Sequence, residues 1–258
     1  MSTKRNLTGS CLGLLMMIIG MTFSSTTSAQ LMGISVNFQG SGSAMLSTDV
    51  AGIVPLSNWN NITSAASWTN LNSANLVDSS GGATSAKFSI NYGYSSAGVG
   101  NKGPLAGDNA MLGGSMVYTS AATINLTGIS YSLVDVYVYV GPGESGKYGN
   151  ANYNGSVNIG STTYYYTNIN NAADYVLGTD TVGPANVAAG ADYVKFSNVS
   201  ISGGSLKINL QAFNWGNTGI YGFQIVDVSA IPEPSTYALL LTGVLLLAGL
   251  RVRDRKRI

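Results

Sequence analysis

The sequence contains no histidine and a single cysteine, Cys11, and only 9% of its 258 residues are charged. Without histidine, no Ser-His-Asp or Cys-His catalytic arrangement can form, and the usual zinc sites are excluded. Cys11 lies near the N-terminus, so a mature chain that loses its first residues has no disulfide. Stability must then come from hydrophobic burial and from backbone hydrogen bonds.

Basic residues are scarce in the middle of the chain and gather at its two ends. Residues 30–230 contain five lysines, no arginine, eight aspartates and one glutamate, which gives a net charge near −4. A protein that binds nucleic acid needs a basic surface to neutralise the phosphates, so we expect no nucleic-acid partner. The hydrophobic content of 45% favours a folded chain over a disordered one.

The N-terminus has the three-part layout of a secretory signal peptide. Lys4 and Arg5 precede an apolar run over residues 12–21, and small polar residues follow up to Ala29. A helix of that run spans roughly 15 Å, about half of a bilayer core, which makes a membrane span the weaker interpretation. We predict a signal peptide over residues 1–29, cleaved after Ala29, and export of the remaining chain.

The C-terminus joins a proline motif, an apolar run and a basic tail. Pro232, Glu233 and Pro234 precede the apolar run, and residues 234–250 would form a helix of about 25 Å. Arginines that snorkel at its end extend this to the thickness of a membrane, which predicts a transmembrane helix. Basic residues mark the cytoplasmic side, so the domain is expected outside the inner membrane. The tail contains Arg251, Arg253, Arg255, Lys256 and Arg257.

The arrangement of residues 231–258 resembles the PEP-CTERM sorting signal of exported proteins from Gram-negative bacteria. The resemblance implies that Pro232, Glu233 and Pro234 are recognised by an exosortase, a membrane-embedded cysteine transpeptidase that removes the helix and passes the protein toward the cell surface. It also implies an association with exopolysaccharide and biofilm. A plain C-terminal anchor, in which the prolines only start a helix, is the alternative interpretation.

Residues 30–230 alternate between apolar and polar residues with a period of two, which predicts half-buried β-strands. The expected strands cover residues 34–38, 88–94, 123–127, 134–140, 206–212 and 221–226. Turn-forming clusters separate them, and no amphipathic helical stretch of twelve residues occurs. We therefore predict an all-β fold over residues 30–230, a single β-sandwich or jelly-roll domain.

Residues 51–61, 135–141 and 219–226 resemble a β-sandwich module that recurs in exported bacterial proteins. The module is similar in style to galactose-binding-like jelly rolls. This resemblance implies a fold, and no function follows from a fold alone.

Tyrosines cluster between residues 137 and 166 and are interleaved with asparagines. Aromatic rings present flat apolar faces, and asparagine both donates and accepts hydrogen bonds, a combination that suits sugars. We predict glycan contacts by Tyr137, Tyr139, Tyr164 and Tyr166. The alternative is that these tyrosines only pack between strands, as tyrosine does in any sandwich.

Carboxylates give little sign of catalysis or of a dedicated metal site. Glu144 is the one glutamate of residues 30–230, whereas glycoside hydrolysis needs two carboxylates around the bond. We expect no catalytic residues and no cofactor. A structural calcium ion remains open, because several aspartates lie among polar turn residues without the spacing of a known loop. These aspartates are Asp78, Asp108, Asp180 and Asp192.

The sequence thus predicts a non-catalytic protein of the cell surface or extracellular matrix, held in the inner membrane before processing. Its expected partners are an exosortase-type transpeptidase and exopolysaccharide. Two alternatives stay open, a calcium-dependent glycan-processing enzyme and an ice-binding or structural surface protein, because runs of Thr, Ser and Asn also suit such surfaces.

Overall fold

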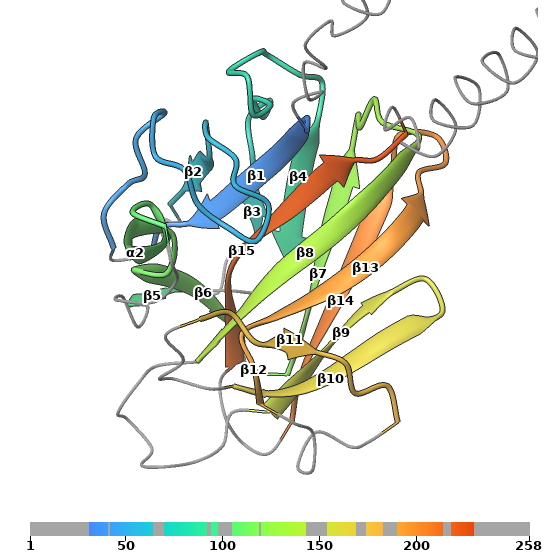
Figure 1. Cartoon of the computed structure of the whole chain (residues 1–258). Coiled ribbons are helices and arrows are strands. Elements are labelled where there is room, and N and C mark those ends of the chain that lie inside the picture. Colours follow the sequence, from blue (N-terminus) through green and yellow to red (C-terminus); the bar gives the residue numbers. More distant parts are fainter. Residues whose placement is uncertain are drawn as a thin grey trace, which may run out of the picture. The chain divides into compact units, whose positions relative to one another are not determined.

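The computed structural model describes residues 31–40, 42–63, 70–91, 94–97, 105–118, 120–142, 154–168, 174–182, 190–213 and 218–229. These residues form two β-sheets that pack face to face (Figure 1). The predicted all-β class is confirmed. Within the described part of the chain there is one helix, α2 (Asp108–Met111), of four residues.

The eight-stranded sheet has the order β11-β13-β8-β15-β1-β2, and β6 and β5 extend it by pairing of β6 with β15. The central pairs β13-β8, β8-β15 and β15-β1 are antiparallel. Its strands are β1 (Gly33–Phe38), β2 (Asn60–Ile62), β5 (Tyr94–Ala97), β6 (Gly114–Tyr118), β8 (Leu133–Pro142), β11 (Leu177–Gly178), β13 (Tyr193–Ser200) and β15 (Thr218–Asp227).

The seven-stranded sheet has the order β12-β10-β9-β14-β7-β4-β3. All of its neighbouring strands are antiparallel except β10 and β12. Its strands are β3 (Leu71–Asn72), β4 (Lys87–Asn91), β7 (Ala121–Thr127), β9 (Asn154–Ile159), β10 (Thr162–Asn168), β12 (Gly190–Ala191) and β14 (Leu206–Phe213).

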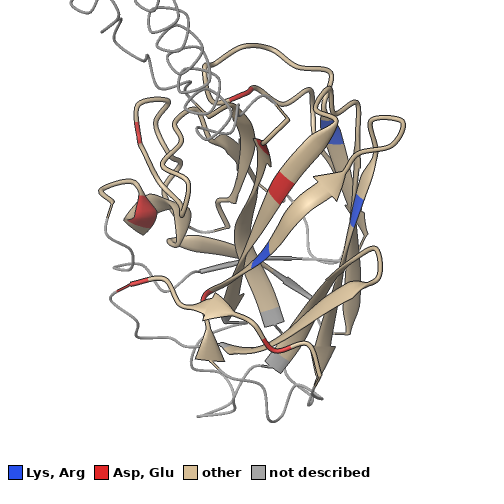
Figure 2. Ribbon diagram, turned by 45° about the vertical axis from the view of Figure 1, so that its right-hand side comes forward, with Lys and Arg blue, Asp and Glu red and all other residues tan. Residues whose placement is uncertain are grey.

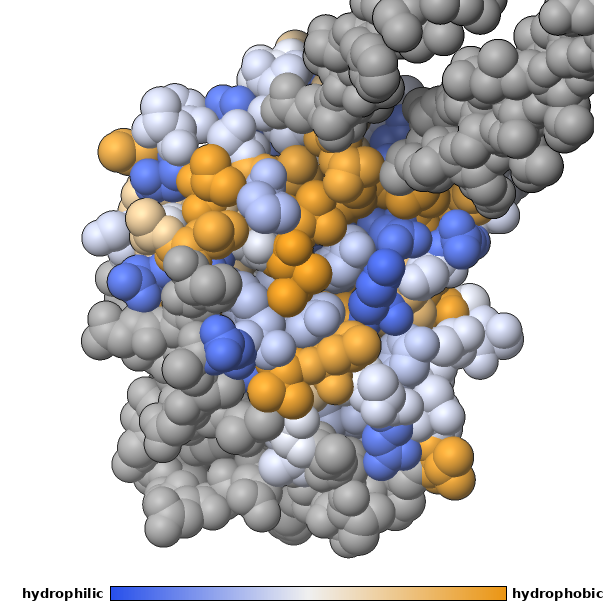
Figure 3. Space-filling view, viewed as in Figure 1, coloured by the Kyte–Doolittle hydropathy of each residue, from blue (hydrophilic) through white to orange (hydrophobic). Residues whose placement is uncertain are grey.

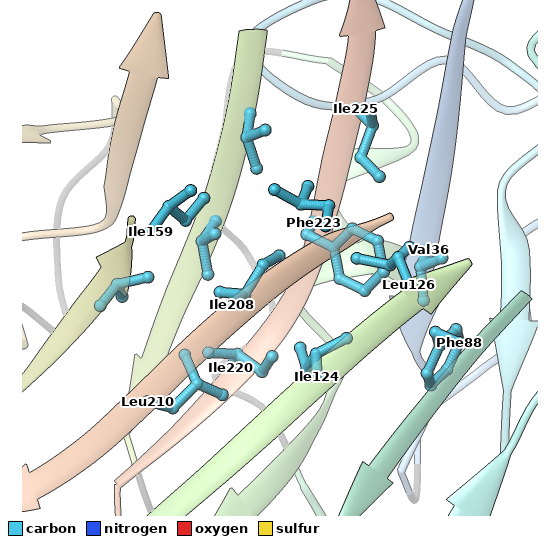
Figure 4. Close-up of a cluster of buried hydrophobic side chains, with 14 of the residues drawn as sticks. Val36, Phe88, Ile124, Leu126, Ile159, Ile208, Leu210, Ile220, Phe223 and Ile225 are labelled. Carbon is cyan, nitrogen blue, oxygen red and sulfur yellow. The ribbon is translucent and has the colours of Figure 1, made fainter. Parts of the chain in front are cut away.

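The main hydrophobic core lies between the two sheets and is built from the apolar half of each alternating strand. Figure 4 shows Ile124, Ile208 and Phe223 pointing into this space. Phe88 lies with its ring centroid 5.9 Å from that of Phe223, and the two rings are nearly perpendicular, which is a favourable aromatic geometry. Burying these side chains is the dominant favourable contribution to folding.

A second hydrophobic cluster covers the outer face of the eight-stranded sheet. Residues 45–59 and α2 supply one side of it, and Tyr137, Tyr139 and Tyr221 supply the other. As a result all six residues of β1 are buried, including the polar Asn37. The expectation of half-buried strands is therefore wrong for β1, β15 and most of β8, because a layer of loops shields their second face, whereas β13 keeps an exposed side. Figure 3 shows apolar surface over these loops and over β11.

Several strands differ from the expected ones. The strand predicted over residues 88–94 is two strands, since β4 ends at Asn91 in one sheet and β5 begins at Tyr94 in the other. Strands β6, β9, β10 and β13 were not expected. In β13 a bulge between Phe196 and Val199 breaks the alternation. Asn198 in this bulge has a φ of 55°, and its N–H donates to the Asp135 carboxylate at 2.9 Å.

Candidate functional site

Three of the four tyrosines predicted to contact glycans are buried. Tyr139 and Tyr166 have no exposed surface, and Tyr137 is only 6% exposed. A ring with no accessible face cannot stack on a sugar, so the prediction is corrected for these residues. Tyr164 is half-buried and packs against the core, with its ring centroid 4.9 Å from that of Phe196.

Tyr139 joins the loop layer to the eight-stranded sheet instead. Its hydroxyl accepts a hydrogen bond from the N–H of Ile53 at 2.7 Å and donates to Oε1 of Gln224. The Gln224 side chain in turn donates to the carbonyl of Val54 at 2.8 Å. Burial raises the pKa of Tyr139 well above its ordinary value, so this hydroxyl stays protonated and structural.

Tyr165 lies between the two core-facing tyrosines of β10 and therefore points away from the core. It lines a groove of about 370 Å³ on the outer face of the seven-stranded sheet. Strands β7, β14, β9 and β10 form this groove side by side. We call it the groove, and its lining residues are Ala121, Ala122, Thr123, Ser156, Asn158, Thr163, Tyr165, Asn209, Leu210 and Gln211.

One row of polar side chains crosses the groove and is held by its own hydrogen bonds. The Thr123 hydroxyl donates to Oδ1 of Asn209 at 3.3 Å, and Nδ2 of Asn209 donates to Oδ1 of Asn158 at 3.1 Å. Nδ2 of Asn158 then donates to the Thr163 hydroxyl at 3.0 Å. Because each amide is oriented by its neighbours, this row is rigid before any ligand binds.

The next row combines an aromatic surface with free polar groups. Gln211 pairs in register with Ser156, which pairs with Tyr165. The Tyr165 ring lies 6.2 Å from the ring of Phe213, at 36° to it. Gln211 is exposed and Ser156 is only 5% exposed, and neither side chain makes a hydrogen bond to another described residue. An apolar ring beside groups that both donate and accept suits the two faces of a sugar.

Among the residues that the structure describes, those that line the groove carry no charge. Lys207 lies on the same strand as Asn209 and is exposed, one row away. Asp180 forms an isolated bridge with Tyr165, and its Oδ1 accepts from the N–H of Val182 at 2.9 Å. Charged residues are sparse over the described ribbon as a whole (Figure 2).

The aspartates considered for calcium lie in separate segments of the chain, where their carboxylates accept hydrogen bonds from N–H groups. Asp108 is completely buried and accepts from Gly52 at 2.8 Å, and Asp192 accepts from Val176 at 3.0 Å. Burial raises the pKa of Asp78, but bonds from Ser80 and Gly82 outweigh it and keep the pKa below its ordinary value. Among the described residues no three potential metal-ligating acidic, histidine or cysteine side chains cluster.

Several predicted residues lie outside the described residues. These are the cleavage site at Ala29, the motif Pro232–Pro234, the basic tail and Glu144. In the part of the chain that is described, no helix has the length and apolar character needed to cross a membrane. The predictions for both termini therefore stay predictions.

The groove residues Tyr165, Asn158, Asn209 and Gln211 were not predicted as a site. For Asn209 and Gln211 the signal was present as the polar half of an alternating strand, whereas the Tyr-Tyr-Tyr run that contains Tyr165 does not alternate. This signal identified no site, because alternation does not show which strands pair with each other. No known protein family matches the chain, and no curated protein matches it.

Proposed function

We propose that this chain is an exported, non-catalytic protein of the cell surface or extracellular matrix, and that its β-sandwich binds polysaccharide in the groove. The observation that carries the proposal is the Tyr165–Phe213 aromatic pair beside a pre-oriented row of amides. Stacking on an aromatic face and hydrogen bonding to side-chain amides together recognise sugar rings. Such binding needs no catalytic group, in keeping with a chain that has no histidine.

We also propose that the β-sandwich is a jelly roll that resembles the galactose-binding-like modules. Along the chain β7, β8, β9, β13, β14 and β15 alternate between the seven-stranded and the eight-stranded sheet. Repeated crossing of this kind supports the likeness. The signal peptide and the transmembrane helix would flank this domain.

The proposed route to the surface rests on the two ends of the sequence. The signal-peptide layout up to Ala29 supports export, and the basic tail after Leu250 supports a cytoplasmic C-terminus before processing. The motif Pro232–Pro234 is the proposed recognition element for an exosortase-type enzyme. The two prolines of the sequence predict an extended segment, a form that enzymes bind through backbone pairing and a few pockets.

Binding is tested by electrophoresis of the full-length protein through gels that contain dissolved polysaccharides, among them dextran, galactomannan and alginate. We expect at least one of them to retard the protein, and replacement of Tyr165 by Ala to abolish the retardation. Tyr193→Ala is the matched control, since Tyr193 is a half-buried tyrosine on the other sheet. The proposal is contradicted if both variants lose retardation equally, or if no polysaccharide retards the wild-type protein.

Sorting is tested with the double change of Pro232 and Pro234 to Ala in a strain that has an exosortase. Alanine favours a helix by about 3 kcal/mol relative to proline, so the membrane helix would extend over the motif and hide it. We expect normal export but retention of the full-length chain in the inner membrane. Mass spectrometry of the C-terminus measures this, and an unprocessed wild type with residues 235–258 intact would refute the sorting proposal.

A further inference from the structure

We infer that the groove selects neutral polysaccharides over acidic ones and needs no metal ion to bind them, an inference that rests on the proposed function. This inference concerns the charge of the polysaccharide, which the proposed function does not specify. The side chains that line the groove determine which charge it accepts.

The described lining of the groove offers an anionic sugar no cation to pair with in return for its lost hydration. Its ten lining residues include amides, hydroxyls, one tyrosine and three apolar residues, and none of them is charged. A carboxylate or sulfate moved from water into such a site loses solvation without gaining an ion pair, which is costly. A sugar hydroxyl, in contrast, finds both donors and acceptors here.

The described charged residues beside the groove, Lys207 and Asp180, do not change this conclusion. Lys207 lies one row away and is exposed, so its attraction for an anion is weakened by water and by salt. Asp180, which forms an isolated bridge with Tyr165, carries a negative charge that would repel an acidic sugar rather than attract it. Metal-mediated sugar binding needs several carboxylates around one ion, and the lining residues include none.

The arrangement also indicates how one sugar ring would lie. Its apolar face would rest on Tyr165, and its hydroxyls would meet Gln211, which is exposed and makes no side-chain hydrogen bond to another described residue. The Thr163 hydroxyl accepts its hydrogen bond from Asn158, which leaves its own hydrogen for a ligand oxygen. Each of these contacts is made with an uncharged part of the sugar.

The test compares the dissociation constants of the full-length protein for dextran, galactomannan and laminarin with those for alginate and polygalacturonate. We expect at least one neutral polymer to bind more tightly than either acidic one. We also expect EDTA, or a rise in NaCl from about 0.05 M to about 0.5 M, to change its dissociation constant by less than about twofold. The Tyr165→Ala change should weaken that binding by about tenfold or more.

Two further variants separate charge from folding. Lys207→Ala should leave binding of the neutral polymer unchanged, and Gln211→Lys should create binding to alginate that is lost in high salt. Tight, salt-sensitive binding of alginate by wild type that Lys207→Ala abolishes would overturn the inference and leave the proposed function standing. No binding to any of the five polymers would overturn both.

Discussion

Gly52, Tyr139 and Gln224 meet where the loop layer lies on the eight-stranded sheet. Gly52 has a φ of +89°, and a Cβ there would lie 2.6 Å from Oε1 of Gln224 and 2.7 Å from the hydroxyl of Tyr139. Its N–H also donates to the buried carboxylate of Asp108. Only glycine permits this close approach, and a polar network that is fully satisfied fixes the loop in one position.

We therefore expect Gly52→Ala to destabilise the protein more than Gly203→Ala does. Both glycines have positive φ, which costs an alanine about 1–2 kcal/mol, but a Cβ at Gly203 meets nothing within 4 Å. The additional clash at Gly52 should add about 1–3 kcal/mol to the loss in free energy of unfolding. Urea denaturation measures the difference, and equal losses for the two variants would show that the loop yields without cost.

Strand β10 shows how a single element separates structure from recognition. Tyr164 and Tyr166 face the core, and Tyr165 faces the groove, because successive side chains of a strand point to opposite faces. The predicted glycan contacts included both core-facing residues of this strand and omitted the outward one. The sequence run Tyr-Tyr-Tyr has no alternation of its own, so it does not tell which face is buried.

This element predicts a contrast between two neighbouring substitutions. Tyr166→Ala removes a completely buried ring and should lower the free energy of unfolding by about 3–5 kcal/mol. Tyr165→Ala removes a half-buried ring that contacts Phe213 and should cost about 1 kcal/mol or less. Thermal unfolding of the two variants measures this contrast. If Tyr165→Ala lowered the free energy of unfolding more than Tyr166→Ala, the outward ring would be structural, which contradicts its proposed role in binding.

At the scale of the whole molecule, the absence of histidine shapes the response to pH. Histidine is the side chain that ordinarily changes charge between pH 6 and 8, and this chain contains none. Its tyrosines respond at higher pH. Burial, and next the charges of Asp78 and Asp227, raise the pKa of Tyr131 to about 12. The pKa of Tyr175 is also raised, by burial first and then by Asp108.

We expect a free energy of unfolding that is nearly constant from about pH 6 to about pH 8 and falls above pH 10. A tyrosine in the unfolded chain loses its proton near pH 10, whereas the buried ones keep theirs, so rising pH favours the unfolded state. Urea denaturation across this range measures the effect. Tyr131→Phe should reduce the alkaline loss, and a transition centred near pH 6.5 would contradict the prediction.

The sequence by itself determined the class of the fold and most of its long strands. Period-two alternation located the strands that became β1, β7, β8, β14 and β15, since half of each strand faces the core between the sheets. Composition likewise determined which chemistry the chain lacks, because a missing residue type is missing in every conformation.

Only the tertiary structure decided which faces are covered and which residues form a site. Alternation divides a strand into two faces, but residues 45–59, distant in sequence, decide that Tyr137 and Tyr139 lie under a second layer. The groove likewise needs Thr123, Asn158 and Asn209 from three strands in one row, and strand order and register bring them there. The physical reason is that burial and pairing depend on non-local contacts, whereas alternation is a local property of the chain.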